Sequence, residues 1–130
     1  MIITWHGDTC FTIKEKGVTL VIDPYKDIKD APQKADIVLL TNETRETVKF
    51  DGEPKIFDWP GEYETCDIPI KALQAWDKSL SDEEKEGKGN PLNVFRFEIA
   101  GMNLCHLGNI GHLLKSEMIE ELGDVEVLFL

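Results

Sequence analysis

The sequence predicts a single α/β domain of the α+β kind, built mostly from short strands with one short helix near its C-terminal end. Short apolar or alternating segments recur along the chain, and turns containing Gly or Pro separate them. One segment alone combines helix-capping signals with an apolar face. The length of 130 residues fits one domain, spanning residues 1–130.

The sequence of the N-terminal part predicts three strands, over residues 2–5, 10–14 and 18–22. In the second of these, Phe11 and Ile13 alternate with polar residues, as expected of a half-buried strand. A turn containing Gly17 joins the second and third strands as a hairpin. The third strand ends at Asp23-Pro24, because proline lacks the N–H group that a sheet ladder needs.

The middle of the chain predicts a polar loop over residues 26–35 and a strand over residues 37–40. That strand is apolar throughout, which indicates burial on both faces. Further strands are expected over residues 55–57 and 68–73. Residues 58–64 between them contain Pro60 and Gly61 and are predicted to form turns.

The C-terminal part starts with residues 79–90, which lack an apolar face and are predicted to form a mobile loop. Residues 93–99 and 103–106 then form a hairpin around residues 100–102. Ser116 is the expected N-cap of a short helix, and Gly123 is its C′ residue. A final strand is predicted over residues 125–130.

The composition argues against nucleic-acid and membrane binding. The chain has 25 acidic and 14 basic residues, giving a net charge of −11, and such a surface repels phosphate groups and anionic lipid. It contains neither an apolar run of about 20 residues nor a signal-peptide pattern at its start. Cys10, Cys66 and Cys105 have no metal-finger spacing, so we expect buried thiols in a reducing cytoplasm.

Five segments carry a family resemblance in one order. They are Trp-His-Gly-Asp-Thr-Cys-Phe at 5–11 with Ile-Asp-Pro at 22–24, the strand at 35–41, Pro-Gly-Glu-Tyr-Glu at 60–64, residues 70–77, and Cys-His-Leu-Gly-Asn-Ile-Gly-His at 105–112. Together they resemble the metallo-β-lactamase superfamily, in particular its small Zn-dependent hydrolase branch that includes ascorbate-6-phosphate lactonase-like proteins. The resemblance implies an αβ/βα sandwich, of which this chain corresponds to the N-terminal half only.

The resemblance also implies where the zinc ligands should be. In that branch a strand ending in Thr is followed by His-x-His-x-Asp-His, and Thr41 is present here. Amide and hydroxyl groups are poor replacements for the imidazoles that usually bind zinc. By the resemblance, the expected ligand positions hold other residues here, which gives a degenerate metal site. These positions are Asp8, Asn42, Thr44, Glu46, Thr47, Asp77 and Asn109.

We therefore expect the family zinc to be lost, with no catalytic residue and no other cofactor. The predicted function is that of a non-catalytic member, or pseudoenzyme, acting by binding or self-assembly. An alternative is a metal-dependent hydrolase with an oxygen-rich site for a hard cation, formed by Asp8, Glu43, Glu46 and Asp77. Another is a small-molecule site in the old cleft, near Trp5, Asn109 and the three histidines His6, His106 and His112.

The C-terminal strand suggests a protein partner. In the family this strand leads into a second αβ half, so we expect part of the first sheet to be uncovered here. Uncovered apolar surface and unpaired strand edges both favour association. We expect Val125, Val127 and Phe129 to contact a partner, most simply a second copy in a homodimer. The alternative is a monomer in which the chain's own loops cover that face.

Overall fold

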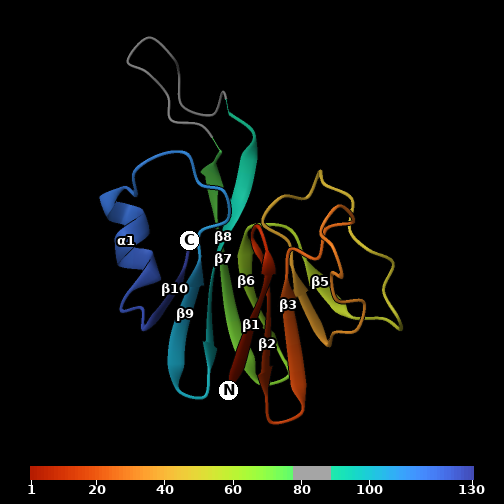
Figure 1. The fold of residues 1–130 in the computed structure, drawn as a ribbon. Coiled ribbons are helices and arrows are strands. Elements are labelled where there is room, and N and C mark those ends of the chain that lie inside the picture. The colour runs from red at the N-terminus through yellow and green to blue at the C-terminus, as the bar shows by residue number, and fades with distance from the viewer. Residues whose placement is uncertain (78–88) are drawn as a thin grey trace.

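The computed structural model describes residues 1–77 and 89–130, which form two five-stranded sheets packed face to face (Figure 1). The loop predicted over residues 79–90 lies almost wholly outside the described residues. The two-sheet architecture with one short helix confirms the predicted fold class. No helix in residues 1–77 and 89–130 has the length and apolar character that crossing a membrane requires.

The first sheet has the strand order β1-β2-β3-β4-β5. Strands β1 to β3 pair antiparallel, whereas β3, β4 and β5 run parallel to one another. The parallel arrangement brings the C-terminal ends of β3 and β4 to the same edge of the sheet. The strand bounds are β1 Ile2–Gly7, β2 Cys10–Glu15, β3 Val18–Ile22, β4 Ile37–Leu39 and β5 Lys55–Phe57.

The second sheet has the order β10-β9-β8-β7-β6. It is antiparallel except for β10, which runs parallel to β9. The helix α1, Ser116–Leu122, lies between β9 and β10 in the chain. The strand bounds are β6 Gly61–Thr65, β7 Ile68–Trp76, β8 Pro91–Ile99, β9 Met102–His106 and β10 Val127–Phe129.

The main core fills the space between the sheets, where alternate residues of both sheets meet, such as Ile13 and Leu20 with Phe95 and Phe97. On the other face of the second sheet, α1 buries Leu122 in a separate apolar cluster. A third cluster around Tyr25 packs under the loops that connect β3, β4 and β5. These loops and α1 lie on opposite sides of the molecule (Figure 1).

Several predicted boundaries were wrong. Residues 61–65 form the strand β6 rather than turns, and β7 continues to Trp76. The last strand is limited to three residues, Val127–Phe129. Ser116 is the first helical residue and not the N-cap; that position belongs to Lys115, which makes no side-chain capping bond. The hairpin between β8 and β9 was predicted correctly.

The expected partner-contact residues point into the molecule. Parallel pairing places Phe129 opposite His106, and its ring packs 4.7 Å from that of Phe11, leaving the residue 5% exposed. Val127 packs against the main core and Val125 against the cluster under α1. Phe129 is therefore turned into the core, whereas Val125 and Val127 are half-buried, and the contact of these three residues with a partner stays a prediction.

Exposed apolar residues instead gather on the two edge strands β1 and β10 and just after β10. In these segments the large exposed side chains are Ile2, Ile3, Trp5, Leu128 and Leu130. At the opposite side of the sandwich the sheets are joined, because Phe57 of β5 stacks on Tyr63 of β6. Of the four edge strands, β1 and β10 thus carry most of the large exposed apolar side chains, while β5 carries only Ile56.

The cysteines differ from one another. Cys10 and Cys105 are buried, and burial raises the pKa of Cys10 to about 12 and that of Cys105 to about 11. Cys66 is exposed in the turn between β6 and β7, with a φ of 52°, so the prediction that all three are buried was wrong for this residue. A raised pKa keeps the two buried thiols protonated and unreactive at neutral pH.

Candidate functional site

A cavity of about 180 Å³ opens where the segments following β3 and β4 meet the turn between β1 and β2. Its position follows from the parallel pairing of β3 and β4, which directs both following segments to one edge of the sheet. The cavity is lined by Asp8, Thr9, Tyr25, Thr41, Asn42, Arg45, Asp77, Pro91, Leu92 and Asn109.

Asp23 does not line this cavity but holds two of its lining residues, Tyr25 and Thr41, in place. It is fully buried directly after β3, with a φ of 54°. One carboxylate oxygen accepts hydrogen bonds from the Thr41 N–H at 2.7 Å and the Tyr25 hydroxyl at 2.9 Å, and the other accepts from Thr41 Oγ1 at 2.6 Å. Three donors to one buried carboxylate lock the ends of β3 and β4 together.

Tyr25 extends this network toward Asn42. The Asn42 N–H donates to the Tyr25 hydroxyl at 2.8 Å. Burial raises the pKa of Tyr25 far above its usual value, and the nearby Asp23 adds to that increase. Tyr25 therefore remains a neutral phenol, which positions the backbone after β4 and supplies no base.

Arg45 is the cationic residue of the cavity lining. Its guanidinium lies 4.0 Å from the centroid of the Tyr25 ring, within cation–π range. One terminal nitrogen lies 3.3 Å from Asp8 Oδ2, and the other donates to both carboxylate oxygens of Asp27, at 2.8 and 3.0 Å. Arg45 thus connects the β1–β2 turn to the loop after β3.

The structure brings together four of the seven predicted metal-site positions, since Asp8, Asn42, Asp77 and Asn109 all line this cavity. Two of them are engaged by near neighbours. Asn42 Oδ1 accepts from the Thr44 N–H and hydroxyl at 3.0 and 2.7 Å. Asp77 accepts from the backbone and side-chain nitrogens of Asn90 at 2.9 and 3.1 Å.

The other three positions, Thr44, Glu46 and Thr47, are not among the residues that line the cavity. Glu46 is exposed and lies 3.8 Å from the ammonium group of Lys26. Thr47 forms an isolated β-bridge with Tyr25. Residues 44–47 therefore pass beside the cavity, and of these residues Arg45 lines it.

His106 is a structural histidine. It is 1% exposed, its Nδ1 accepts from the Gly108 N–H at 2.9 Å, and its Nε2 lies 2.9 Å from the Thr9 carbonyl oxygen. These partners require a neutral ring protonated at Nε2. Burial lowers the pKa of His106, which favours the same neutral form.

The other two histidines also lie outside the cavity lining. The His6 Nε2 lies 2.6 Å from Thr12 Oγ1. His112 accepts the Trp76 N–H at 3.1 Å through Nε2, and its Nδ1 lies 2.9 Å from the Leu113 carbonyl oxygen. The three rings thus lie outside this cavity, His112 lines a separate hollow of about 240 Å³ beside α1, and the ligand cleft near His6, His106 and His112 stays a prediction.

Sequence reasoning missed the residues that dominate the site. Arg45 stands inside the segment that resembles the metal motif, but its partners Asp8 and Asp27 lie 37 and 18 positions away in the chain. Asp23 was interpreted as the end of a strand. A signal was available, since an acidic residue directly after an apolar strand has to find donors if it is buried.

Comparisons with known proteins agree with this fold. Residues 2–130 match the family model described as the beta-lactamase superfamily domain. A protein from Thermotoga maritima, described as a candidate Zn-dependent hydrolase of the metallo-beta-lactamase superfamily, has a solved structure that superposes with a TM-score of 0.77 at 32% identity over 97% of this chain. The chain therefore belongs to the metallo-β-lactamase superfamily.

Other similar proteins match a smaller share of this chain or have a lower sequence identity to it. A candidate metal-dependent hydrolase from Parabacteroides distasonis superposes with a TM-score of 0.67 at 17% identity, which supports the fold alone. UPF0173 proteins of Pyrococcus abyssi and Pyrococcus furiosus are 50% and 41% identical over 44 residues, which is 33% of this chain. The chain spans 58% of the length of the Thermotoga protein and 21% of each Pyrococcus protein.

The residues of the cavity do not fit a zinc ion. Within residues 1–77 and 89–130, no three His, Cys, Asp or Glu side chains are grouped closely enough to hold a metal. Asp8 faces the guanidinium of Arg45, and the side-chain oxygen of Asn42 already accepts two hydrogen bonds. A fixed positive charge beside the remaining oxygen atoms repels a divalent cation.

Proposed function

We propose that this protein is a non-catalytic member of the metallo-β-lactamase superfamily that acts by binding or self-assembly. The observation that supports the proposal is the Arg45 guanidinium held between Asp8 and Asp27 in the cavity where the family resemblance places a metal. An arginine remains charged at all physiological pH values. It pairs with Asp8, one of the predicted metal-site positions, and it offers no activated water.

One observation favours an alternative in which the site binds a hard cation and supports hydrolysis. Asp8, Asn42, Asp77 and Asn109 line one cavity, and their side chains carry the oxygen ligands that Mg²⁺ or Ca²⁺ accepts. That function would require Asp8 to exchange Arg45 for the metal. The two functions thus differ in whether Arg45 excludes the cation.

Metal quantitation tests the proposal. Protein purified without chelator should contain less than about 0.1 equivalent of zinc, manganese or iron, and calorimetric titration with Mg²⁺, Ca²⁺ or Mn²⁺ should show no site tighter than about 1 mM. A matched variant, Arg45→Gln, removes the competing charge without emptying the cavity. Stoichiometric metal in the unaltered protein, bound with an affinity that Arg45→Gln leaves unchanged, would support the hydrolase alternative. Binding that appears only in Arg45→Gln, at least about tenfold tighter than in the unaltered protein, would show that Arg45 excludes the cation, as proposed.

For the assembly part of the function, we propose a homodimer formed through the edge strands β1 and β10 in the cytoplasm. Unpaired edges and the exposed side chains of Ile2, Trp5 and Leu128 support association there. Light scattering at tens of micromolar should give twice the mass of the 14.8 kDa chain. Leu128→Lys should shift the protein to a monomer, whereas Leu113→Lys, in the loop before α1, should not. A monomeric unaltered protein would exclude the dimer.

A further inference from the structure

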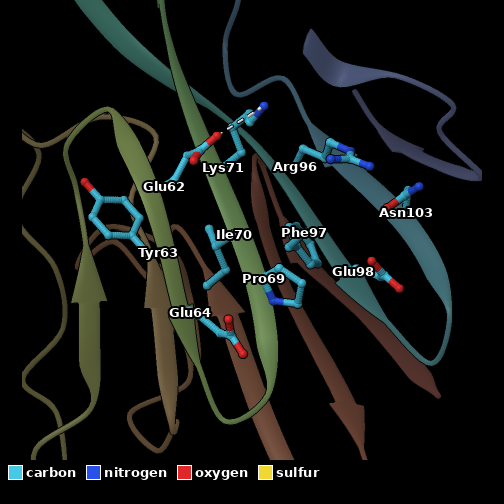
Figure 2. Close-up of a pocket in the computed structure, with 10 residues that line it drawn as sticks. All are labelled: Glu62, Tyr63, Glu64, Pro69, Ile70, Lys71, Arg96, Phe97, Glu98 and Asn103. Carbon is cyan, nitrogen blue, oxygen red and sulfur yellow. Dashed lines mark ion pairs between the residues drawn. The ribbon is translucent and has the colours of Figure 1, made fainter.

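A second and larger hollow lies on the outer face of the second sheet, away from the Arg45 cavity. It is a groove of about 490 Å³ that crosses β6, β7, β8 and β9 (Figure 2). Ile70 and Phe97 contribute to the core between the sheets, so their neighbours Lys71 and Arg96 point to the opposite face and into this groove. The volume is typical of a small-molecule site.

Strand register arranges the polar side chains of the groove in two rows. Glu62 lies opposite Lys71, and Lys71 lies opposite Arg96. In the next row Glu64 lies opposite Pro69, and Glu98 lies opposite Asn103. Figure 2 shows both rows facing the same hollow. The groove therefore carries three carboxylates and two cations on neighbouring strands.

Of the two cations in the groove, Lys71 has carboxylate partners and Arg96 has none among the residues that the structure describes. The Lys71 ammonium lies 3.4 Å from Glu62 and 3.6 Å from Glu121 of α1. Arg96 has no hydrogen bond or ion pair with any residue that the structure describes, and its Nε is buried without a partner. Like charges opposite one another in a sheet repel, so Lys71 further destabilises the unpaired charge of Arg96.

Asn103, in the same groove, has an acceptor oxygen without a hydrogen-bond donor among residues 1–77 and 89–130. Its Oδ1 is buried and accepts no hydrogen bond from the described part of the chain. A buried donor and a buried acceptor left without partners each cost free energy, and a rotation of the two side chains into the groove would let a ligand satisfy both. The groove thus offers a cationic donor at Arg96 and an unused acceptor at Asn103.

We propose that this groove binds a small zwitterion of the amino-acid or short-peptide class. Its carboxylate would pair with the Arg96 guanidinium, whose planar geometry suits a carboxylate. Its ammonium group would donate to Asn103 Oδ1 and to the carboxylates of Glu64 and Glu98. A simple anion is disfavoured by the three glutamates, and a simple cation is disfavoured by Arg96 and Lys71.

Three small probes separate these possibilities. Glycylglycine carries both charges at neutral pH, N-acetylglycine only the carboxylate, and glycinamide only the ammonium group. In ¹H–¹⁵N NMR titrations, glycylglycine should shift the Arg96 Nε–H signal and the amides of Glu98 and Asn103 saturably, with a Kd at or below about 10 mM. The singly charged probes should bind at least about tenfold more weakly.

Two variants and a matched control complete the test. Arg96→Gln should weaken glycylglycine binding at least about tenfold, whereas Lys14→Gln, the same change of charge at an exposed position of β2, should leave it unchanged. Glu98→Gln, which leaves Arg96 in place, should weaken glycylglycine but improve N-acetylglycine. These results would support the site even if the Arg45 cavity proved to bind metal, because the two sites share no residue.

Three outcomes would overturn the proposal. The first is the absence of a saturable shift with any probe up to about 50 mM. The second is equal binding of glycylglycine and N-acetylglycine, which would indicate a plain anion site. The third is equal loss of binding in Arg96→Gln and Lys14→Gln, which would mean that the shifts report net charge alone.

Discussion

The two polar sites of this protein differ in how completely their side chains are paired. Behind the lining of the Arg45 cavity, Asp23 accepts three hydrogen bonds from Tyr25 and Thr41, and Arg45 itself contacts two carboxylates and an aromatic ring. In the groove on the second sheet, a guanidinium nitrogen of Arg96 and the amide oxygen of Asn103 are buried without partners. One site is closed by the chain's own residues, whereas the other is incomplete.

This difference indicates what each site contributes. A polar network whose members satisfy one another stabilises the fold and leaves little free energy for a ligand. Unpaired buried groups destabilise the fold slightly and reward whatever pairs with them. The Arg45 cavity lies where the family resemblance places a metal, but its interactions are those of a structural joint between β3, β4 and the β1–β2 turn.

The strongest test of that joint is the replacement of Asp23. Asp23→Ala leaves the Thr41 N–H, the Thr41 hydroxyl and the Tyr25 hydroxyl without their acceptor, at roughly 1–3 kcal/mol each. We expect the free energy of unfolding, measured with urea, to fall by about 4 kcal/mol or more. Asp23→Asn keeps the side-chain shape and one acceptor and tolerates the positive φ, so it should lose less. Equal losses would show that the hydrogen bonds are not the cause.

A second test concerns the close contact beneath His106. Gly108 has a φ of 62°, and a Cβ there would lie 2.9 Å from the Thr41 Cβ. Gly108→Ala should therefore destabilise the protein by about 2–3 kcal/mol, through overpacking and backbone strain together. Gly101→Ala is a matched control, because its φ is 74° but no atom lies within 4 Å of the added Cβ. It should lose only about 1 kcal/mol. Similar thermal shifts for both variants would exclude overpacking.

Much of the fold was predictable because its strands carry strong local signals. The apolar run Ile37–Leu39 and the hairpin turn containing Gly17 both depend on residues adjacent in sequence. The strand β6 was missed because the run Glu62-Tyr63-Glu64 offers one apolar side chain, and Pro60-Gly61 before it resembles a turn. Tyr63 reveals the strand only through its stacking on Phe57, a contact that periodicity does not report.

The site was less predictable than the fold. The resemblance directed attention to Asp8, Asn42, Asp77 and Asn109, which line one cavity although they are far apart in the chain. It could not indicate that Arg45 enters the same cavity, because ion pairing over long sequence distances depends on the tertiary arrangement. The groove around Arg96 carried no motif at all, since its residues become neighbours only through strand register.

The third prediction uses pH to test the neutral state of His106. Burial lowers the pKa of this residue in the folded protein, so protonation at acid pH favours the unfolded chain. The stability that depends on neutral His106 is complete above its unfolded pKa, about 6.5, and is lost as the pH falls below that value. Between about pH 8 and about pH 5, urea unfolding of the native protein should therefore lose more stability than that of His106→Gln. Parallel pH profiles would contradict the assignment.

The smallest expected effect concerns the Arg45 ion pairs themselves. The Arg45 side chain is 31% exposed, whereas those of Asp8 and Asp27 are 55% and 75% exposed, so solvent screens both pairs. A double-mutant cycle with Arg45→Gln and Asp27→Asn should give a coupling energy of about 0.5–1 kcal/mol, and about 1 M salt should reduce it. A matched cycle on Lys71 and Glu62, a single contact of 3.4 Å, should give a smaller value because Asp27 binds Arg45 through two oxygens. Equal couplings would show that the second Asp27 oxygen does not contribute, and Arg45 would then be held in the cavity mainly through its contact with Tyr25.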